Sequence, residues 1–252
     1  MRSSSIRAIF FDAGNTLLYP RLDERARDLT TAGFPARVED FQAAERTAKQ
    51  KLDAWLWPQI RQGEVPRTID HYYWLEYLTS LMGLIGAPES EHARLIKLVA
   101  DGFRNIRTWS VVMPGTSEYL NSLHTQGYFL GVISNSIGTI EDQLEHVGLR
   151  AYFHAVFDSA IVGVEKPHPE IFQLALAKAQ VARSEAVFVG DTHATDVGGA
   201  QLAGLNGVLI DRVGAYPEAQ CPRIESLPEL DKVLIELGVR CQVSGAGAEN
   251  PN

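Results

Sequence analysis

The sequence predicts an α/β protein, in which helices cover both faces of a parallel sheet and a separate helical segment follows the first strand. Short runs of apolar residues, rich in β-branched and aromatic side chains, recur along the chain, and stretches with helical periodicity separate them. Strands that alternate with helices of about 10–12 residues are typical of βαβ units. The 252 residues are 45% hydrophobic and 21% charged, which is enough to bury the core of an ordinary globular protein.

The strands and helices are expected as follows. A strand buried on both faces is predicted at residues 6–11, and similar runs predict strands at residues 129–134, 155–157, 186–189 and 207–210. Helical periodicity predicts helices at residues 116–125, 137–147, 169–180, 194–203 and 227–237. Because right-handed crossovers connect parallel strands, the ligand crevice is expected at the carboxyl ends of the strands.

The long gap between the first two strands is helical. Residues 18–108 have helical spacing of apolar side chains, with Pro and Gly breaks near residues 33–35, 63–66 and 86–88. About four helices are therefore expected there. The predicted domain organisation is an α/β core formed by residues 1–17 and 109–241, a helical cap at 18–108, and a disordered tail at 242–252 that is rich in Gly, Ser, Ala and Asn.

The charge and cysteine content exclude several classes of function. With 23 Lys and Arg against 31 Asp and Glu, the net charge of −8 argues against nucleic-acid or anionic-membrane partners. No apolar run approaches the roughly 18–20 residues of a membrane span. Cys221 and Cys241 lack the spacing of metal ligands. We therefore expect a cytoplasmic protein with a small-molecule partner; nothing in the sequence indicates an oligomeric state.

Polar side chains follow the predicted strands at the expected crevice. Asp12 ends the first strand and precedes Gly14-Asn15, a pair suited to a tight turn. Ser134 and Asn135 end the second strand. Lys166, one of only six lysines, precedes a Pro-His-Pro sequence that opens a helix. Each of these features alone is common turn or loop chemistry.

Two acids follow the strand predicted at residues 186–189. Asp191 and Asp196 are five residues apart, just past a buried strand. Carboxylate oxygens, together with water and phosphate oxygens, are the ligands that Mg²⁺ prefers. The pair can therefore converge on one divalent cation, although two acids at a helix N-terminus also complement the helix dipole.

Taken together, these residues resemble the motifs of the haloacid dehalogenase-like (HAD) superfamily. The resemblance covers residues 5–16 and 109–240, and the helical insert resembles the cap that this superfamily carries after its first motif. It implies a Rossmann-like parallel sheet core with an inserted all-helical cap domain. The motif residues, in chain order, are Asp12, Ser134, Lys166, Asp191 and Asp196.

The resemblance implies a hydrolase, expected to be a phosphatase that acts on a small phosphorylated metabolite. Asp12 would be the nucleophile that forms an aspartyl-phosphate. Ser134, Asn135 and Lys166 would bind the phosphoryl oxygens. Mg²⁺ would be the cofactor. Its implied ligands are Asp12, the backbone carbonyl of Gly14, Asp191 and Asp196, the last of which would alternatively orient Lys166.

The sequence departs from the family pattern at one position. The phosphatases of the family carry a second Asp two residues after the nucleophile, as general acid and base, and this chain has Gly14 there. A positioned acid or base contributes roughly 10²–10⁴-fold to a rate, so the enzyme is expected to be slow unless another group moves the proton. His193 and His168, which lie beside the motif residues, are the candidates.

Other functions stay open at this point. Haloacid dehalogenases of the family need no metal, and the Asp191 and Asp196 pair argues against them. Phosphonatases carry a small residue at the position of Gly14 and use a cap lysine as an amine nucleophile, but Lys49 and Lys51 are interpreted as part of an exposed helix face. A protein that binds a phosphorylated ligand or a partner without catalysis is the third possibility.

Aromatic residues in the insert are candidates for a substrate-facing surface, although aromatics at helical spacing are more often core. These residues, with one arginine, are Trp55, Trp57, Arg61, Tyr72, Tyr73 and Trp74.

Overall fold

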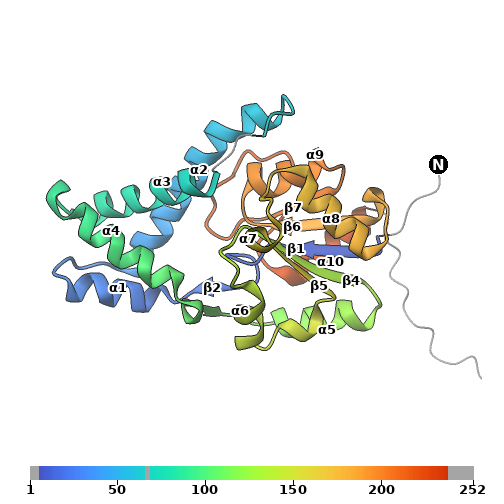
Figure 1. Ribbon diagram of the computed structural model, residues 1–252, viewed down its shortest axis with the longest axis horizontal. Helices are drawn as coiled ribbons and strands as arrows, with labels where there is room; N and C mark the ends of the chain where they lie inside the picture. Colours follow the sequence, from blue (N-terminus) through green and yellow to red (C-terminus); the bar gives the residue numbers. More distant parts are fainter. Residues whose placement is uncertain (1–5, 66–68, 238–252) are drawn as a thin grey trace, which may run out of the picture.

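A six-stranded parallel sheet lies at the centre of the computed structural model, which describes residues 6–65 and 69–237 (Figure 1). The strand order is β5-β4-β1-β6-β7-β8, and every paired strand runs parallel to its neighbour. The α/β fold class predicted from the sequence is confirmed, and only the short edge strand β8 was not expected. The strands are β1 (Ala8–Phe11), β4 (Phe129–Ser134), β5 (Ala155–Asp158), β6 (Ala186–Gly190), β7 (Asn206–Ile210) and β8 (Arg223–Ile224).

Helices cover both faces of the sheet. Tyr119 and Leu144, from α5 and α6, pack on one face, and Phe172, from α8, packs on the other. These helices are α5 (Thr116–Thr125), α6 (Ile140–His146), α7 (Ser159–Val162), α8 (Pro169–Ala179), α9 (Gly199–Leu202) and α10 (Leu230–Glu236). The helix expected at residues 194–203 is instead a π-helical turn, η4 (His193–Gly198), followed by α9.

The pleat of β1 explains why one short strand supports two cores. Successive side chains of a strand point to opposite faces of the sheet. Ile9 and Phe11 accordingly belong to the core cluster under α5, α6 and α10, whereas Ala8 and Phe10 belong to the cluster under α8 and α9. All four side chains are fully buried, so β1 is uniformly apolar, as the sequence indicates.

Four helices lie together beside the sheet, and we call them the cap helices (Figure 1). They share a core of their own that includes Leu29, Phe41, Leu81 and Val99. The chain enters them through β2 (Tyr19–Pro20) and leaves through β3 (Trp109–Val111), and these strands pair as an antiparallel ribbon. The cap helices are α1 (Leu22–Thr31), α2 (Val38–Ile60), α3 (Ile69–Leu84) and α4 (Glu89–Arg104).

Helix α2 packs against the remainder of the protein. Its residues Leu52, Leu56 and Ile60 form a second buried cluster with Ala194 of the π-helical turn. Arg46 also donates a hydrogen bond of 2.7 Å to the backbone carbonyl of Val213. The long helix therefore has one face in the cap core and another against the carboxyl ends of the strands.

Some predictions fall outside the described part of the chain, namely the tail at residues 242–252 and Cys241. Among the helices that the structure describes, none has the length and apolar character needed to cross a bilayer.

Candidate active site

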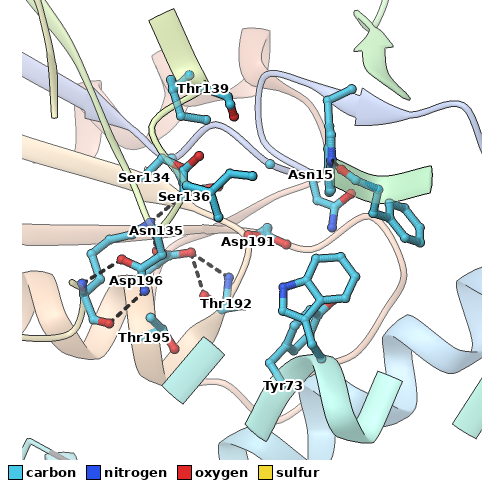
Figure 2. A pocket seen from close by; sticks show the side chains of 18 of the residues that line it. Asn15, Tyr73, Ser134, Asn135, Ser136, Thr139, Asp191, Thr192, Thr195 and Asp196 are labelled. Carbon is cyan, nitrogen blue, oxygen red and sulfur yellow. Dashed lines mark hydrogen bonds and ion pairs between the residues drawn. The ribbon is translucent and has the colours of Figure 1, made fainter. Parts of the chain in front are cut away.

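A cavity of about 500 Å³ lies at the carboxyl ends of the strands (Figure 2). Asp12 follows β1, Ser134 ends β4 and Asp191 follows β6, because parallel strands in register end at the same edge of the sheet. All three line the cavity, as do Lys166 and Asp196. The structure thus brings together the five motif side chains that the sequence placed in the site.

Lys166 joins two of the carboxylates. Its Nζ lies 2.6 Å from Oδ1 of Asp12 and 2.6 Å from Oδ1 of Asp196. Burial by itself lowers the pKa of Lys166, but the two carboxylates outweigh that effect and raise the pKa above its ordinary value. Lys166 is therefore a fixed ammonium group between two acids, and it lies 5.2 Å from the ring centroid of Phe188.

The backbone of Lys166 is held by Asn135. The side-chain Oδ1 of Asn135 accepts a hydrogen bond of 2.7 Å from the backbone N–H of Lys166, and its Nδ2 donates one of 3.0 Å to the carbonyl of the same residue. The sequence assigned Asn135 to substrate binding. That role stays a prediction; in the structure Asn135 lines the cavity and its amide bonds to the backbone N–H and carbonyl of Lys166.

Asp196 is engaged by protein groups through both carboxylate oxygens. Oδ1 accepts from Lys166, while Oδ2 accepts hydrogen bonds from the backbone N–H and the hydroxyl of Thr192, at 2.9 and 2.7 Å. A Cβ on Gly190 would collide with the Asp196 side chain, so the glycine that ends β6 makes room for it. This geometry suits an orienting role for Asp196 better than that of a direct metal ligand.

Three buried acids can hold a metal ion. Ligand oxygens of Asp12, Asp191 and Asp196 lie within 4.8 Å of one another. Asp12 uses Oδ1 for Lys166, and Asp191 uses Oδ2 for a second lysine, Lys49. Each of these two carboxylates therefore keeps one oxygen without a hydrogen bond or ion pair within the described residues. Hard carboxylate oxygens are the donors that Mg²⁺ takes.

The charge balance of the site also fits a divalent cation. Burial raises the pKa of Asp12 to about 7, against the opposing effect of Lys166. It raises the pKa of Asp191 to about 6, against that of Lys49. With Glu45 and Asp196, four buried carboxylates face two buried ammonium groups, a formal surplus of two negative charges. A nearby cation would favour the ionised carboxylates.

Lys49 is the main site residue that the sequence reasoning placed wrongly. It was interpreted as part of an exposed helix face, but its side chain is 2% exposed, and its Nζ lies 2.7 Å from Glu45 and 2.8 Å from Asp191. Burial lowers the pKa of Lys49, and Asp191 and Glu45 together raise it well above its ordinary value. Lys51, two residues on, does lie on the surface, paired with Glu76.

A pattern in α2 could have revealed Lys49. The buried apolar residues Leu52, Leu56 and Ile60 form a stripe with helical spacing, and Lys49 and Glu45 extend that stripe toward the start of the helix. Two opposite charges four residues apart on an otherwise apolar face indicate a buried ion pair. Taken one residue at a time, the same segment is indistinguishable from a solvated helix surface.

Gly14 lies beneath an indole ring. A Cβ built on Gly14 would lie 3.4 Å from Cζ3 of Trp109, the first residue of β3. Asn15 has a left-handed backbone (φ 54°) and donates its backbone N–H to the carbonyl of Leu18, which closes the turn that the sequence predicted. The space beside the usual position of the general acid is thus occupied by Trp109.

Neither histidine considered as a proton donor lines the cavity. Nδ1 of His193 lies 3.0 Å from Asp53 of α2, and its ring centroid lies 4.0 Å from that of Trp57. Burial lowers the pKa of His193, but contacts with Asp53 and Cys221 outweigh it and raise the pKa to about 9. The side chain of His168 accepts from the backbone N–H of Glu170 at the start of α8.

The far wall of the cavity comes from the cap helices and is mostly apolar. Figure 2 shows Tyr73 on the opposite side of the pocket from Ser134 and Asp196. Of the residues proposed from the sequence for a substrate-facing surface, Tyr73 and Trp74 line the cavity, and Trp55, Trp57, Arg61 and Tyr72 do not. The cap-helix residues of the wall are Leu52, Tyr73, Trp74, Leu78, Ala100, Phe103 and Arg104.

Comparison with known proteins decides the family. Residues 6–204 match the family model of haloacid dehalogenase-like hydrolases. The chain belongs to that family. The HAD-like hydrolase is 32% identical over 226 residues to haloacid dehalogenase-like hydrolase domain-containing protein 3 of Bos taurus, covering 89% of this chain and 88% of that protein. The resemblance inferred from the motifs is therefore confirmed.

Two further relatives illustrate the breadth of the family. A glyceraldehyde 3-phosphate phosphatase of Methanopyrus kandleri is 26% identical over 230 residues, covering 90% of this chain and 92% of that protein. The structure of the HAD-hydrolase YfnB from Bacillus subtilis superimposes with a TM-score of 0.64 at 22% identity, covering 91% of this chain and 99% of that one. That structural similarity supports the fold of the HAD-like hydrolase.

Proposed function

We propose that this HAD-like hydrolase is a magnesium-dependent phosphatase that acts on a small phosphorylated molecule through an aspartyl-phosphate. The observation that supports it most directly is the pairing of Asp12 with Lys166 at the base of the cavity, with Asp191 beside them. Phosphatase relatives such as the Methanopyrus kandleri enzyme favour the same reaction class. In this proposal residues 1–17 and 109–241 form the catalytic core and residues 18–108 form the cap.

The proposed roles follow from the contacts of each residue. Asp12 attacks phosphorus, since it is a buried carboxylate at the centre of the sheet edge and one of its oxygens has no hydrogen-bond or ion-pair partner among the described residues. Lys166 and Ser134 bind the transferring oxygens and offset their growing negative charge. Asp196 and Asn135 hold Lys166 in place from its two ends.

A bound Mg²⁺ would be held by Asp12, Asp191 and the backbone carbonyl of Gly14, and it would supply Lewis-acid stabilisation of the phosphoryl oxygens. Asp196, which has a carboxylate oxygen within 4.8 Å of those of Asp12 and Asp191, would support this site from beside them. The donor set is composed of oxygen atoms and carries the charge surplus described above, as this cation requires.

The contacts of Lys49 argue against a phosphonatase-type reaction. An amine nucleophile must be deprotonated, whereas Lys49 lies between two carboxylates that stabilise its ammonium form. Lys49 also does not line the cavity. Its burial does bring a lysine of the cap to the site, so reduction with borohydride in the presence of phosphonoacetaldehyde is the appropriate check: we expect no covalent adduct.

Release of inorganic phosphate from acetyl phosphate tests the proposal. We expect turnover that requires Mg²⁺ and is lost by several orders of magnitude in Asp12→Asn, which keeps the shape of the side chain but removes the nucleophile. Asp53→Asn, on the same cap–core boundary but outside the cavity, is the matched control and should retain activity. Tight phosphate binding without turnover would indicate a binding protein instead, and Asp12→Asn activity within about tenfold of wild type would exclude the aspartyl-phosphate.

A further inference from the structure

The cap wall of the cavity is built for an apolar, flat leaving group. Trp74 and Phe103 lie with ring centroids 5.2 Å apart, and Phe103 and Trp109 lie 5.9 Å apart, so three aromatic side chains form a continuous lining. Leu52 and Leu78 extend it. A polyhydroxylated leaving group placed here would lose hydrogen bonds to water that this wall does not replace, at a cost of about 1–3 kcal/mol for each unpaired group.

Charged groups on this wall are few. Arg104 is the one charged side chain that the cap helices contribute to the described lining, and it pairs with Asp101 at 3.3 Å with 71% of its side chain exposed. On this wall, the binding energy available for a leaving group is therefore mainly apolar burial and ring stacking. The cavity volume of about 500 Å³ lies within the range of roughly 300–1,000 Å³ typical of small-molecule sites.

The chemistry at Gly14 leads independently to the same kind of molecule. Gly14 has no side chain to donate a proton, Trp109 packs at van der Waals distance from the place where a Cβ would be, and the structure places no histidine in the described lining of the cavity. Among the lining acids, Asp12 is the proposed nucleophile, Asp196 is held by Lys166 and Thr192, and Asp191 belongs to the metal site. A leaving group that departs without receiving a proton is therefore favoured.

Both observations, together with the proposed phosphatase function on which this step rests, specify one substrate class. We infer that the enzyme hydrolyses phosphate monoesters of phenols, with the aromatic ring of the leaving group bound against Trp74, Phe103 and Trp109. A phenolate spreads its negative charge into the ring, so it leaves readily as an anion, and the same ring fits the aromatic wall.

The reaction consumes one water molecule. An oxygen of Asp12 forms a bond to phosphorus while the bond from phosphorus to the phenolic oxygen breaks, and the electron pair of that bond leaves with the phenolate. The phenolate takes a proton from solvent. Water then adds to phosphorus, the bond from phosphorus to Asp12 breaks, and the water proton passes to solvent, which yields inorganic phosphate and restores the carboxylate.

Assays of the full chain with Mg²⁺ on four phosphates can separate the effect of an aromatic ring from the effect of a good leaving group. Phenyl phosphate has the ring and the good leaving group, benzyl phosphate has the ring alone, acetyl phosphate has the leaving group alone, and glycerol phosphate has neither. We expect phenyl phosphate to have the highest kcat/KM. Benzyl phosphate should fall roughly 10²–10⁴-fold below it in kcat/KM, the usual contribution of general acid catalysis, because kcat/KM reports the step that expels the leaving group and not the later hydrolysis of the shared aspartyl-phosphate.

A variant of the aromatic wall tests the position of the ring. Trp74→Ala should raise the KM for phenyl and benzyl phosphate by about tenfold, within the range of lost aromatic contacts, and leave the KM for acetyl phosphate unchanged. Leu75→Ala, the adjacent exposed residue of α3, is the matched control and should change none of them. If Trp74→Ala also lost turnover of acetyl phosphate, the test would be repeated with Trp74→Leu, because leucine keeps the apolar packing but has no aromatic ring.

The outcomes distinguish the two proposals. Loss of turnover on all four phosphates would refute the phosphatase function itself. Turnover of acetyl phosphate, with glycerol phosphate as good a substrate as phenyl phosphate, would refute only the phenolic substrate class. Equal kcat/KM values for benzyl and phenyl phosphate would show that another group delivers the proton, and would overturn the inference as well.

Discussion

The core and the cap each bring one buried lysine to the same cluster of acids. Lys166 joins Asp12 to Asp196, and Lys49 joins Asp191 to Glu45. Both residues are 2% exposed. Lys166, however, lines the cavity, whereas Lys49 lies behind Asp191, outside the lining. The comparison shows two ways in which a buried lysine can act. Lys166 can contact a molecule in the cavity, whereas Lys49 can only affect the charge and position of Asp191.

The largest expected effect distinguishes the two lysines in catalysis. Lys166→Met should lower kcat for acetyl phosphate by roughly 10²–10³-fold at saturating Mg²⁺, the usual loss on removing one group that stabilises charge in the transition state. Lys49→Met should lower it by less than about tenfold, because Lys49 does not reach the cavity. Steady-state kinetics measure both, and equal losses would contradict the separation of roles.

Asp191 and Asp196, each paired with one of these lysines, are expected to differ in their contribution to Mg²⁺ affinity. Asp191→Asn is expected to weaken Mg²⁺ binding by more than roughly 100-fold, because it removes a charged ligand oxygen, whereas Asp196→Asn should cost about tenfold, as orienting residues do. Calorimetric titration of Mg²⁺ without substrate reads the affinity directly. If the order were reversed, Asp196 would be the direct ligand despite its contacts with Thr192 and Lys166.

Stability should reveal what Lys49 contributes. Lys49→Met leaves Glu45 and Asp191 buried without a cation, so it should lower the free energy of unfolding by about 3 kcal/mol in metal-free protein. Lys51→Met, which breaks only the surface pair with Glu76, should cost less than about 1 kcal/mol. Thermal and urea unfolding measure both.

Mg²⁺ provides a further check on the same pair of variants. We expect Mg²⁺ to raise Tm more in Lys49→Met than in wild type, because the ion replaces part of the lost positive charge beside Asp191. A uniform rise in both proteins would show that Lys49 and the metal site are not coupled.

The smallest expected effect concerns the other contact between cap and core. The pKa of His193 is raised from 6.5 to about 9 in the folded protein. The stabilisation that protonated His193 gives to the folded state is therefore fully present below about pH 6.5 and is lost as the pH rises through about 9. Between about pH 6 and about pH 10, wild type should lose about 1–3 kcal/mol more stability than Asp53→Asn, a conservative range for that pKa shift. If the free energy of unfolding changed with pH in the same way in both proteins, the ion pair between His193 and Asp53 would be contradicted.

The two lysines also show which parts of the site could be predicted from sequence. Asp12, Ser134 and Asp191 were predictable because each ends or follows an apolar strand, and parallel strands bring such ends together. Lys166 stood out as one of six lysines, placed before a Pro-His-Pro sequence, and its role came from the resemblance to the family. Lys49 was not predicted, because a helix carries charges on its exposed face by default, and only packing against the sheet edge decides that this face is buried.

The fold itself followed closely from local pattern. The helix expected at residues 116–125 is α5 without change, since the left-handed Gly115 sets its start. At residues 193–202 the local pattern predicted one α-helix, whereas the structure has a π-helical turn followed by α9, and His193 of that turn contacts Asp53 and Trp57 of α2, which are distant in sequence. Trp109 likewise reaches Gly14 only through the β2–β3 ribbon.

Insertion of the cap after β1 has a consequence for how the chain is made. β1 leaves the ribosome first, yet Ala8 pairs with Phe129 of β4 and Ala186 of β6. At about 5–20 residues per second, roughly ten seconds separate the synthesis of β1 from that of its first partner. The cap helices, whose contacts with one another are more local, can assemble during that interval. Until β4 emerges, β1 is an apolar segment without a strand to pair with, although it is fully buried in the finished enzyme.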